Sequence, residues 1–149
     1  MSPTTTIAAL QTLHAAVSGV TSAPAAYPPS LEASELPCVL VYAGPGLTRW
    51  DSHGGDLKRR ERTYVCRWYV RHLVSGMGID EGMQDTLTLL EAAVALYEET
   101  DDLTNGAQIH LSDADNQAIR DSGVRSDFQY GTEMYRGFEV QISVWEWTS

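Results

Sequence analysis

The segment YGTEMYRGFEVQISVWEWTS, residues 130–149, contains the clearest strand pattern in the chain. Alternate side chains of an extended strand point to opposite faces of a sheet. Four apolar residues at alternate positions are therefore expected to share a face and to pack in a core: Phe138, Val140, Ile142 and Val144. The opposite face begins polar and ends with Trp145 and Trp147, on either side of Glu146.

These two tryptophans require a cover, because a small monomer rarely leaves such an apolar pair in water. Either the N-terminal helix of the same chain or an adjacent protein could supply it. Aromatic residues are enriched at the centres of interfaces, and little chain follows Trp147 to shield it. We therefore expect an adjacent protein to cover Trp145 and Trp147.

Two further strands are predicted upstream. PCVLVYA, residues 37–43, is bounded by Pro37 and by Gly44-Pro45-Gly46. Residues 47–74 are predicted to form a long β-hairpin that turns at SHGGD, residues 52–56. One face of its second arm is apolar and comprises Tyr64, Cys66, Trp68 and Val70. The basic run 58–62 has nothing to bury, so this end of the hairpin is expected to project beyond the core.

Two principal helices are predicted, near residues 3–18 and 80–99. The first has Ser2 at its cap and Pro3 at its first position. The apolar stripe of the second is expected to be Met83, Leu87, Leu90, Val94 and Tyr97. Residues 20–36 are interpreted as an extended connection and residues 107–111 as a short strand.

This order of elements predicts an α+β fold, with both helices on one side of a mainly antiparallel sheet. The sheet should include residues 37–43, 60–74 and 135–147. A chain of 149 residues is most simply one domain, spanning 1–149. No apolar run is long enough for a membrane span, and no leader is evident, so we expect a soluble protein made in a cytoplasm.

The net charge of −10 is unevenly distributed. Residues 49–71 hold seven of the ten basic residues, whereas residues 72–119 hold ten acidic residues and no Lys or Arg. This asymmetry could bring the basic surface of one copy against the acidic surface of the next, in a head-to-tail contact that closes into a ring. The alternative is that both surfaces are simply solvated.

No catalytic or metal-binding motif is evident. His14, His53, His72 and His110 are scattered, and only His53 lies between carboxylates, in DSHGGD. Cys38 and Cys66 are interpreted as buried thiols, although a disulfide remains open. We therefore expect no cofactor, no metal and no enzymatic activity.

Short motifs along the chain resemble those of a known family. They include LPCV at 36–39, Arg62 with Tyr64, an acidic second helix, and a closing Tyr130-Gly131, Tyr135, Gly137-Phe138 pattern. Together they resemble the tail-terminator and tail-completion proteins of long-tailed bacteriophages. The resemblance implies an α+β domain in a hexameric ring, part of the virion tail or neck, that caps the tail tube and joins it to the head connector.

The resemblance also implies that DNA passes through the ring without sequence-specific binding. The residues expected at subunit or partner contacts are Arg59, Arg60, Arg62, Glu91, Glu98, Glu99, Trp145 and Trp147. The basic segment 58–62 could instead contact DNA, which would suit a neck or head-closure protein. A small-ligand-binding or hydrolytic α+β domain is the alternative from another class.

Overall fold

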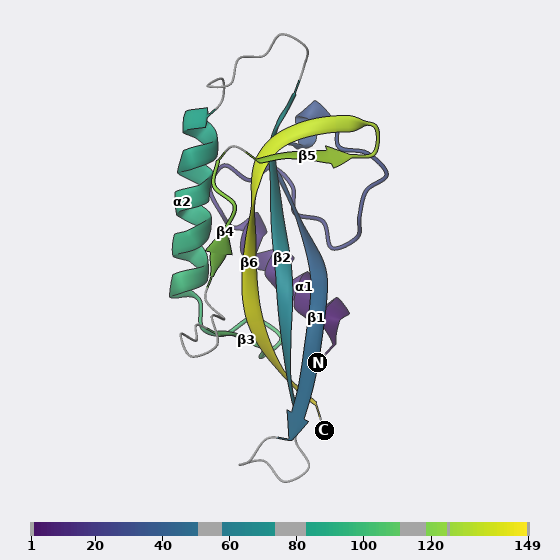
Figure 1. The fold of residues 1–149 in the computed structure, drawn as a ribbon, viewed down its shortest axis with the longest axis vertical. Coiled ribbons are helices and arrows are strands. Elements are labelled where there is room, and N and C mark those ends of the chain that lie inside the picture. The colour runs from purple at the N-terminus through teal and green to yellow at the C-terminus, as the bar shows by residue number, and fades with distance from the viewer. Residues whose placement is uncertain (1, 51–57, 74–82, 111–118, 125, 149) are drawn as a thin grey trace.

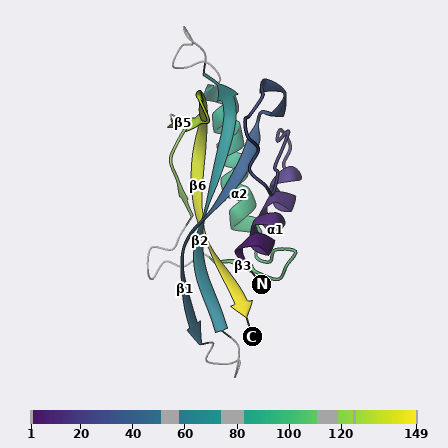
Figure 2. The ribbon, with the colours of Figure 1, turned by 90° about the vertical axis from the view of Figure 1, so that its right-hand side faces the viewer.

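The computed structural model describes residues 2–50, 58–73, 83–110, 119–124 and 126–148. Two α-helices lie against one face of a six-stranded sheet in which each described strand pairs antiparallel with its neighbour, and this confirms the α+β prediction (Figures 1 and 2). In chain order the elements are α1 (Pro3–Ala15), the short 3-10 helix η1 (Ala33–Glu35), β1 (Cys38–Trp50), β2 (Lys58–His72), α2 (Met83–Glu99), β3 (Gln108–His110), β4 (Arg120–Asp121), β5 (Ser126–Tyr130) and β6 (Glu133–Thr148).

β6 pairs with four of the other five strands of the sheet. One of its edges pairs with β2 along nearly its whole length, from Tyr135 opposite His72 to Thr148 opposite Lys58. The other edge is shared in succession by β5, β4 and β3. The alternation predicted for β6 is confirmed, because its four apolar residues are almost fully buried in the main core: Phe138, Val140, Ile142 and Val144.

Both helices pack on that core face. Ser2 caps α1 and Pro3 opens it, as predicted, and the helix buries Ala9 and Leu10. α2 rotates relative to the prediction: it buries Leu89, Ala93 and Tyr97, whereas Leu87 remains 37% exposed. Of the predicted stripe, Tyr97 is fully buried and Leu90 packs against the main core, whereas the prediction for Leu87 is wrong.

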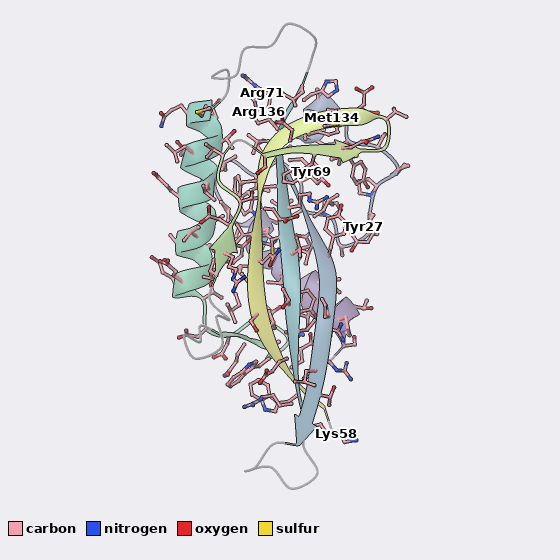
Figure 3. All side chains as sticks on the ribbon, in the orientation of Figure 1. Tyr27, Lys58, Tyr69, Arg71, Met134 and Arg136 are labelled. Carbon is pink, nitrogen blue, oxygen red and sulfur yellow. The ribbon has the colours of Figure 1, made fainter. Side chains whose placement is uncertain are left out.

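A second, smaller core lies on the opposite face of the sheet and was not predicted. Its buried residues are Leu31, Cys38, Leu40, Tyr69 and Tyr135. The connection from α1 to β1 crosses this face and is held by tyrosine hydroxyls, with Tyr135 donating to the carbonyl of Leu31 at 2.7 Å. Tyr69 therefore lies beneath a covered surface near one end of the sheet (Figure 3).

The two cysteines lie on opposite faces of the sheet. Cys66 belongs to the main core and Cys38 to the second core, and both are free. Burial raises the pKa of Cys66 to about 12 and raises the pKa of Cys38 as well. The prediction of buried thiols is confirmed.

β1 is longer than predicted. It continues through Gly44-Pro45-Gly46, with a register shift between Ala43 and Gly46, and ends at Trp50 opposite Lys58. Beyond this register shift β2 is the central strand of three and is flanked by β1 and β6. We name this three-stranded end, residues 46–50, 58–62 and 144–148, the ribbon; it extends beyond both helices (Figure 1).

The expectation that residues 58–62 bury nothing is wrong. Arg59, Arg60 and Arg62 are each partly buried, and Arg62 Nη1 donates to the carbonyl of Gly44 at 2.8 Å. The central position of β2 explains this, because a strand flanked on both edges shields the stems of its side chains. The turn predicted at 52–56 lies outside the described residues, so the projecting hairpin stays a prediction.

Candidate interaction surface

The outer face of the ribbon, which is the face away from the helices, carries both tryptophans and two charged residues. Directly paired residues of antiparallel strands share a face. Leu47 pairs with Glu61, and Glu61 pairs with Trp145; Arg59 pairs with Trp147. We name this set of five residues the tryptophan face: Leu47, Arg59, Glu61, Trp145 and Trp147.

Arg59 is the centre of the tryptophan face. Its guanidinium carbon lies 4.1 Å from the centroid of the Trp145 ring, and its Nη2 lies 3.1 Å from Glu61 Oε1. The rings of Trp145 and Trp147 meet edge to face at 6.3 Å. Arg59 Nε is buried and has no hydrogen-bond partner among the described residues. Arg59 therefore holds the Trp145 ring and Glu61 together on this face, and 28% of its side chain stays exposed.

The N-terminal helix does not cover the tryptophans. Ala9 and Leu10 of α1 pack in the core with Val144, which lies on the other face of β6 from Trp145. Both tryptophans are partly exposed in the isolated chain. The N-terminal helix was one of the two segments expected to cover the tryptophans. The other, an adjacent protein, stays a prediction.

Strand alternation separates the three arginines that were expected to act together. Arg59 belongs to the tryptophan face, whereas Arg60 and Arg62 lie on the helix side of the ribbon. Arg60 Nε donates to Thr48 Oγ1 at 3.2 Å. Arg62 bonds to the backbone of β1, so its side chain already serves the ribbon itself.

Glu146 is fully buried, although its place between two tryptophans at a strand end is typical of an exposed acid. It lies on the helix side of β6, where the hydroxyl of Tyr64 donates to Oε1. Its Oε2 has no hydrogen-bond partner among the described residues. Desolvation, with the bond to Glu146 as a second cause, raises the pKa of Tyr64. Only the strand period, which places Glu146 in line with Val144, could have indicated this position.

The predicted acidic contact residues lie on α2. Glu91, Glu98 and Glu99 are all exposed, and α2 contains four acidic residues and no basic residue. Within one chain α2 lies beside the body of the sheet and the ribbon extends past it (Figure 1). One copy therefore does not bring these glutamates to Arg59.

A buried polar network joins α1, β2 and α2 and was missed in the sequence. Gln11 Nε2 donates to the carbonyls of Pro24 and Val39, both at 2.8 Å, so Gln11 Oε1 accepts from His14 Nδ1 at 2.9 Å. His14 Nε2 then accepts from the Tyr97 hydroxyl at 2.6 Å, and the same oxygen accepts from Trp68 Nε1 at 3.2 Å. The neutral form of His14 satisfies every member of this chain.

We expect this network to make stability depend on pH. Burial lowers the pKa of His14 from 6.5 to about 3. The unfolded chain therefore takes up this proton near pH 6.5, whereas the folded chain resists it, and stability falls as pH decreases from 6.5 toward 3. The loss attributable to His14 should reach about 2 kcal/mol at pH 5.

NMR titration of the imidazole resonances measures this effect directly. The signal of His14 should stay at its neutral position down to about pH 4, given a pKa near 3. A His14 midpoint near 6.5 would show that the folded protein tolerates the charge.

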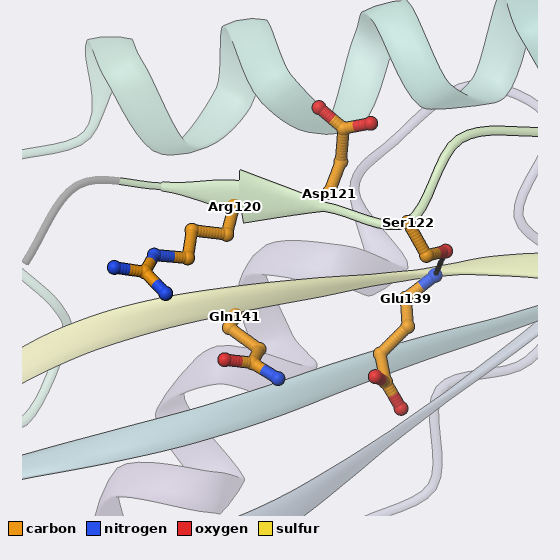
Figure 4. A pocket seen from close by; sticks show the side chains of 5 residues that line it. All are labelled: Arg120, Asp121, Ser122, Glu139 and Gln141. Atoms are coloured by element: carbon orange, nitrogen blue, oxygen red, sulfur yellow. Dashed lines mark hydrogen bonds between the residues drawn. The ribbon is translucent and has the colours of Figure 1, made fainter. Parts of the chain in front are cut away.

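A shallow cavity of about 200 Å³ lies beside β4 (Figure 4). Its lining residues are Arg120, Asp121, Ser122, Glu139 and Gln141. Ser122 Oγ accepts from the backbone N–H of Glu139 at 2.9 Å, and the Glu139 carboxylate pairs with Arg67 at 2.7 Å. The serine and the carboxylate therefore both make structural contacts. None of the described lining residues places a base against the serine oxygen.

No group of three His, Cys, Asp or Glu side chains that could hold a metal occurs among the described residues. The DSHGGD segment lies outside them. In the part of the chain that the structure describes, no helix is long and apolar enough to cross a membrane. Comparison with protein-family models and with curated proteins finds no match for the chain.

Proposed function

We propose that the chain is a structural virion protein of a long-tailed bacteriophage, whose copies form a ring that caps the tail tube and joins it to the head connector. The proposal starts from the sequence motifs that resemble tail terminators. The observation that carries it further is the tryptophan face: two partly exposed tryptophans, one under a guanidinium, on the side of the sheet away from the helices.

Two features of the ribbon suit an intersubunit contact. Its outer face combines tryptophan and arginine side chains, residue types that are enriched at interface hot spots. It is also built on three paired strands, so that its side chains are held in fixed rows before any partner binds. A preorganised surface of this kind loses little conformational entropy on association.

The charge distribution supports a ring through which DNA travels. Acidic residues outnumber basic ones by 20 to 10, and a negative lumen repels the DNA backbone. A neck or head-closure protein is the neighbouring alternative, with the basic segment 58–62 on DNA. In that case the isolated protein should bind duplex DNA with a strong dependence on salt.

Replacing both tryptophans tests the proposal. Trp145→Ser with Trp147→Ser should leave the far-UV circular dichroism spectrum unchanged, because neither side chain belongs to a buried core. The double variant should lose assembly, since it lacks the apolar part of the contact. Sedimentation velocity and negative-stain images with and without tail tubes provide the measurements.

Trp68→Ser is the matched control, because Trp68 is fully buried in the main core and stacks on Phe138 at 5.2 Å. This variant should unfold, with a cost of about 3–5 kcal/mol. If the Trp145/Trp147 double variant unfolds in the same way, those tryptophans belong to the core and the interface proposal is wrong.

A further inference from the structure

We propose that the outer edge of β1 in the ribbon, residues 46–50, binds an extended acidic segment of another protein, which adds to the ribbon as a fourth strand. This inference goes beyond the proposed function, because the ring proposal rests on the tryptophan face and not on this edge. Strand addition is a common mode of peptide recognition, in which backbone hydrogen bonds supply affinity and alternate side chains supply specificity.

β1 is an edge strand of the sheet, and only its first part is covered (Figure 1). The backbone N–H of Val39 donates to the carbonyl of Ser22 at 3.0 Å, and the hydroxyl of Tyr27 donates to the carbonyl of Val41 at 2.7 Å. Further along, no described residue hydrogen bonds to the outward backbone groups of residues 46–50. This part of β1 therefore has an unpaired edge, which is a template for another strand.

The register identifies the backbone groups that point outward. Backbone groups of an antiparallel strand face its partner at every second residue, and those of Val39 face away from β2. From Ala43 to Gly46 β1 advances three residues while β2 advances two, so the outward positions change from odd to even residue numbers. Gly46 and Thr48 are therefore outward positions, and both are exposed.

Two arginines of β2 lean across β1 toward this edge on its helix side. Arg60 Nε donates to Thr48 Oγ1 at 3.2 Å. Arg62 Nη1 donates to the carbonyl of Gly44 at 2.8 Å, and its Cζ would lie 2.8 Å from a Cβ at Gly46. The absence of a side chain at Gly46 thus leaves room for this guanidinium above β1. The unpaired edge carries positive charge as a result.

This charge selects an acidic strand. Among the described helix-side residues of the ribbon, the only acid is Glu146, which is fully buried and bonded to the Tyr64 hydroxyl. Alternate side chains of an added strand would stand beside Gly46 and Thr48, where carboxylates would meet both guanidinium groups in charge-assisted hydrogen bonds. The same guanidinium groups would repel each other if the β1 edges of two copies paired, so a second β1 is disfavoured.

The other edge strands of a second copy do not supply the acid either. Asp127 of β5 already pairs with Arg136 at 3.4 Å, and Asp121 of β4 already accepts from the backbone N–H of Gly123 at 3.0 Å. β3, with the sequence QIH, contains no acidic residue. We therefore assign the added strand to a different protein.

A short capped peptide of alternating glutamate and valine is the probe for this edge. Isothermal titration calorimetry with the full chain should show binding, and the matched peptide of alternating lysine and valine should bind at least about tenfold more weakly. Hydrogen exchange followed by NMR should show that the glutamate peptide protects the amides of Gly46 and Thr48. Equal binding of the two peptides, or no protection of these amides, would overturn the proposal.

Thr48→Pro removes one outward N–H from the edge. The variant should stay folded, because proline is tolerated on an edge strand where the N–H faces solvent. It should bind the glutamate peptide at least about tenfold more weakly, whereas the control Thr48→Ser, which keeps the N–H and a hydroxyl, should bind as wild type does. If Thr48→Pro does not fold, a glutamate peptide methylated on alternate backbone nitrogens tests the same bonds. Undiminished binding of that peptide would overturn strand addition.

The outcomes separate this inference from the ring. Thr48 is not part of the tryptophan face, so Thr48→Pro should leave the assembly state of the wild type unchanged. Assembly that Thr48→Pro abolishes would show that a second copy supplies the strand, and would overturn the assignment to another protein. A monomeric wild type that binds the glutamate peptide would overturn the ring and leave this inference standing. Failure of the wild type to bind the peptide would overturn this inference alone.

Discussion

Replacing Gly137 with alanine is expected to cost at least about 4 kcal/mol and to prevent stable folding at physiological temperature. Gly137 lies in β6 opposite Tyr69. A methyl group there would overlap the carbonyl oxygen of Trp68 and lie 2.9 Å from its carbonyl carbon. The obstacle is backbone in the central strand pair, so no side-chain rotation can relieve it.

Urea unfolding monitored by fluorescence measures this loss, with Gly131→Ala as the control. Gly131 has a φ of 63° in the turn between β5 and β6, and a Cβ at this position would meet nothing within 4 Å. Its substitution should cost about 1–2 kcal/mol through backbone conformation alone. Equal losses in the two variants would mean that the β2–β6 pairing adapts at Gly137.

Tyr97→Phe is expected to destabilise the fold by about 3 kcal/mol, although the substitution removes only one oxygen atom. The change leaves two groups in the main core without their partner, His14 Nε2 and Trp68 Nε1. Each buried unsatisfied group costs about 1–3 kcal/mol. Differential scanning calorimetry and urea unfolding at pH 7, where His14 is neutral, provide the measurement.

Tyr130→Phe separates the network from the general loss of a tyrosine hydroxyl. The Tyr130 hydroxyl donates to the carbonyl of Pro28 near the surface, where water can replace it. This variant should lose at most about 1 kcal/mol. A Tyr97→Phe variant as stable as Tyr130→Phe would show that the buried network contributes little.

The strand pattern of β6 is the part of the fold that the sequence predicted best. Period-two alternation from Phe138 to Val144 requires one face to be buried, and the structure buries that face. The rotation of α2 could not be predicted in the same way, because Leu87 and Leu89 are equally apolar. Leu89 joins Ala93 and Tyr97 in the main core, and tertiary packing rather than local sequence decides between the two leucines.

The hydrogen bonds among the buried polar side chains could not be predicted from the sequence, for a related reason. His14 and Tyr97 are separated by 83 residues, so no local motif connects them. For Glu146 the strand period indicates the face it shares with Val144, but not the Tyr64 hydroxyl that binds it there. Likewise, Pro45 between two glycines favours a strand end, yet a register shift lets β1 continue past it to Trp50.

The candidate surface was predicted in part. Trp145 and Trp147 were expected on the outer face, and they lie there with Arg59. The division of Arg59 from Arg60 and Arg62 follows from strand alternation and could have been predicted once residues 58–62 were assigned to a strand. The position of Leu47 on the tryptophan face could not be predicted, because the register shift between Ala43 and Gly46 decides which residue of β2 it pairs with.

The molecular mass of the wild-type protein in solution tests the central proposal most directly. Native mass spectrometry, with negative-stain images of the same sample, should show a closed ring at six times the chain mass of 16.4 kDa, as the resemblance to tail terminators implies. The population of the ring should fall as salt screens the contact. A protein of 16.4 kDa at every concentration and ionic strength would contradict the proposal.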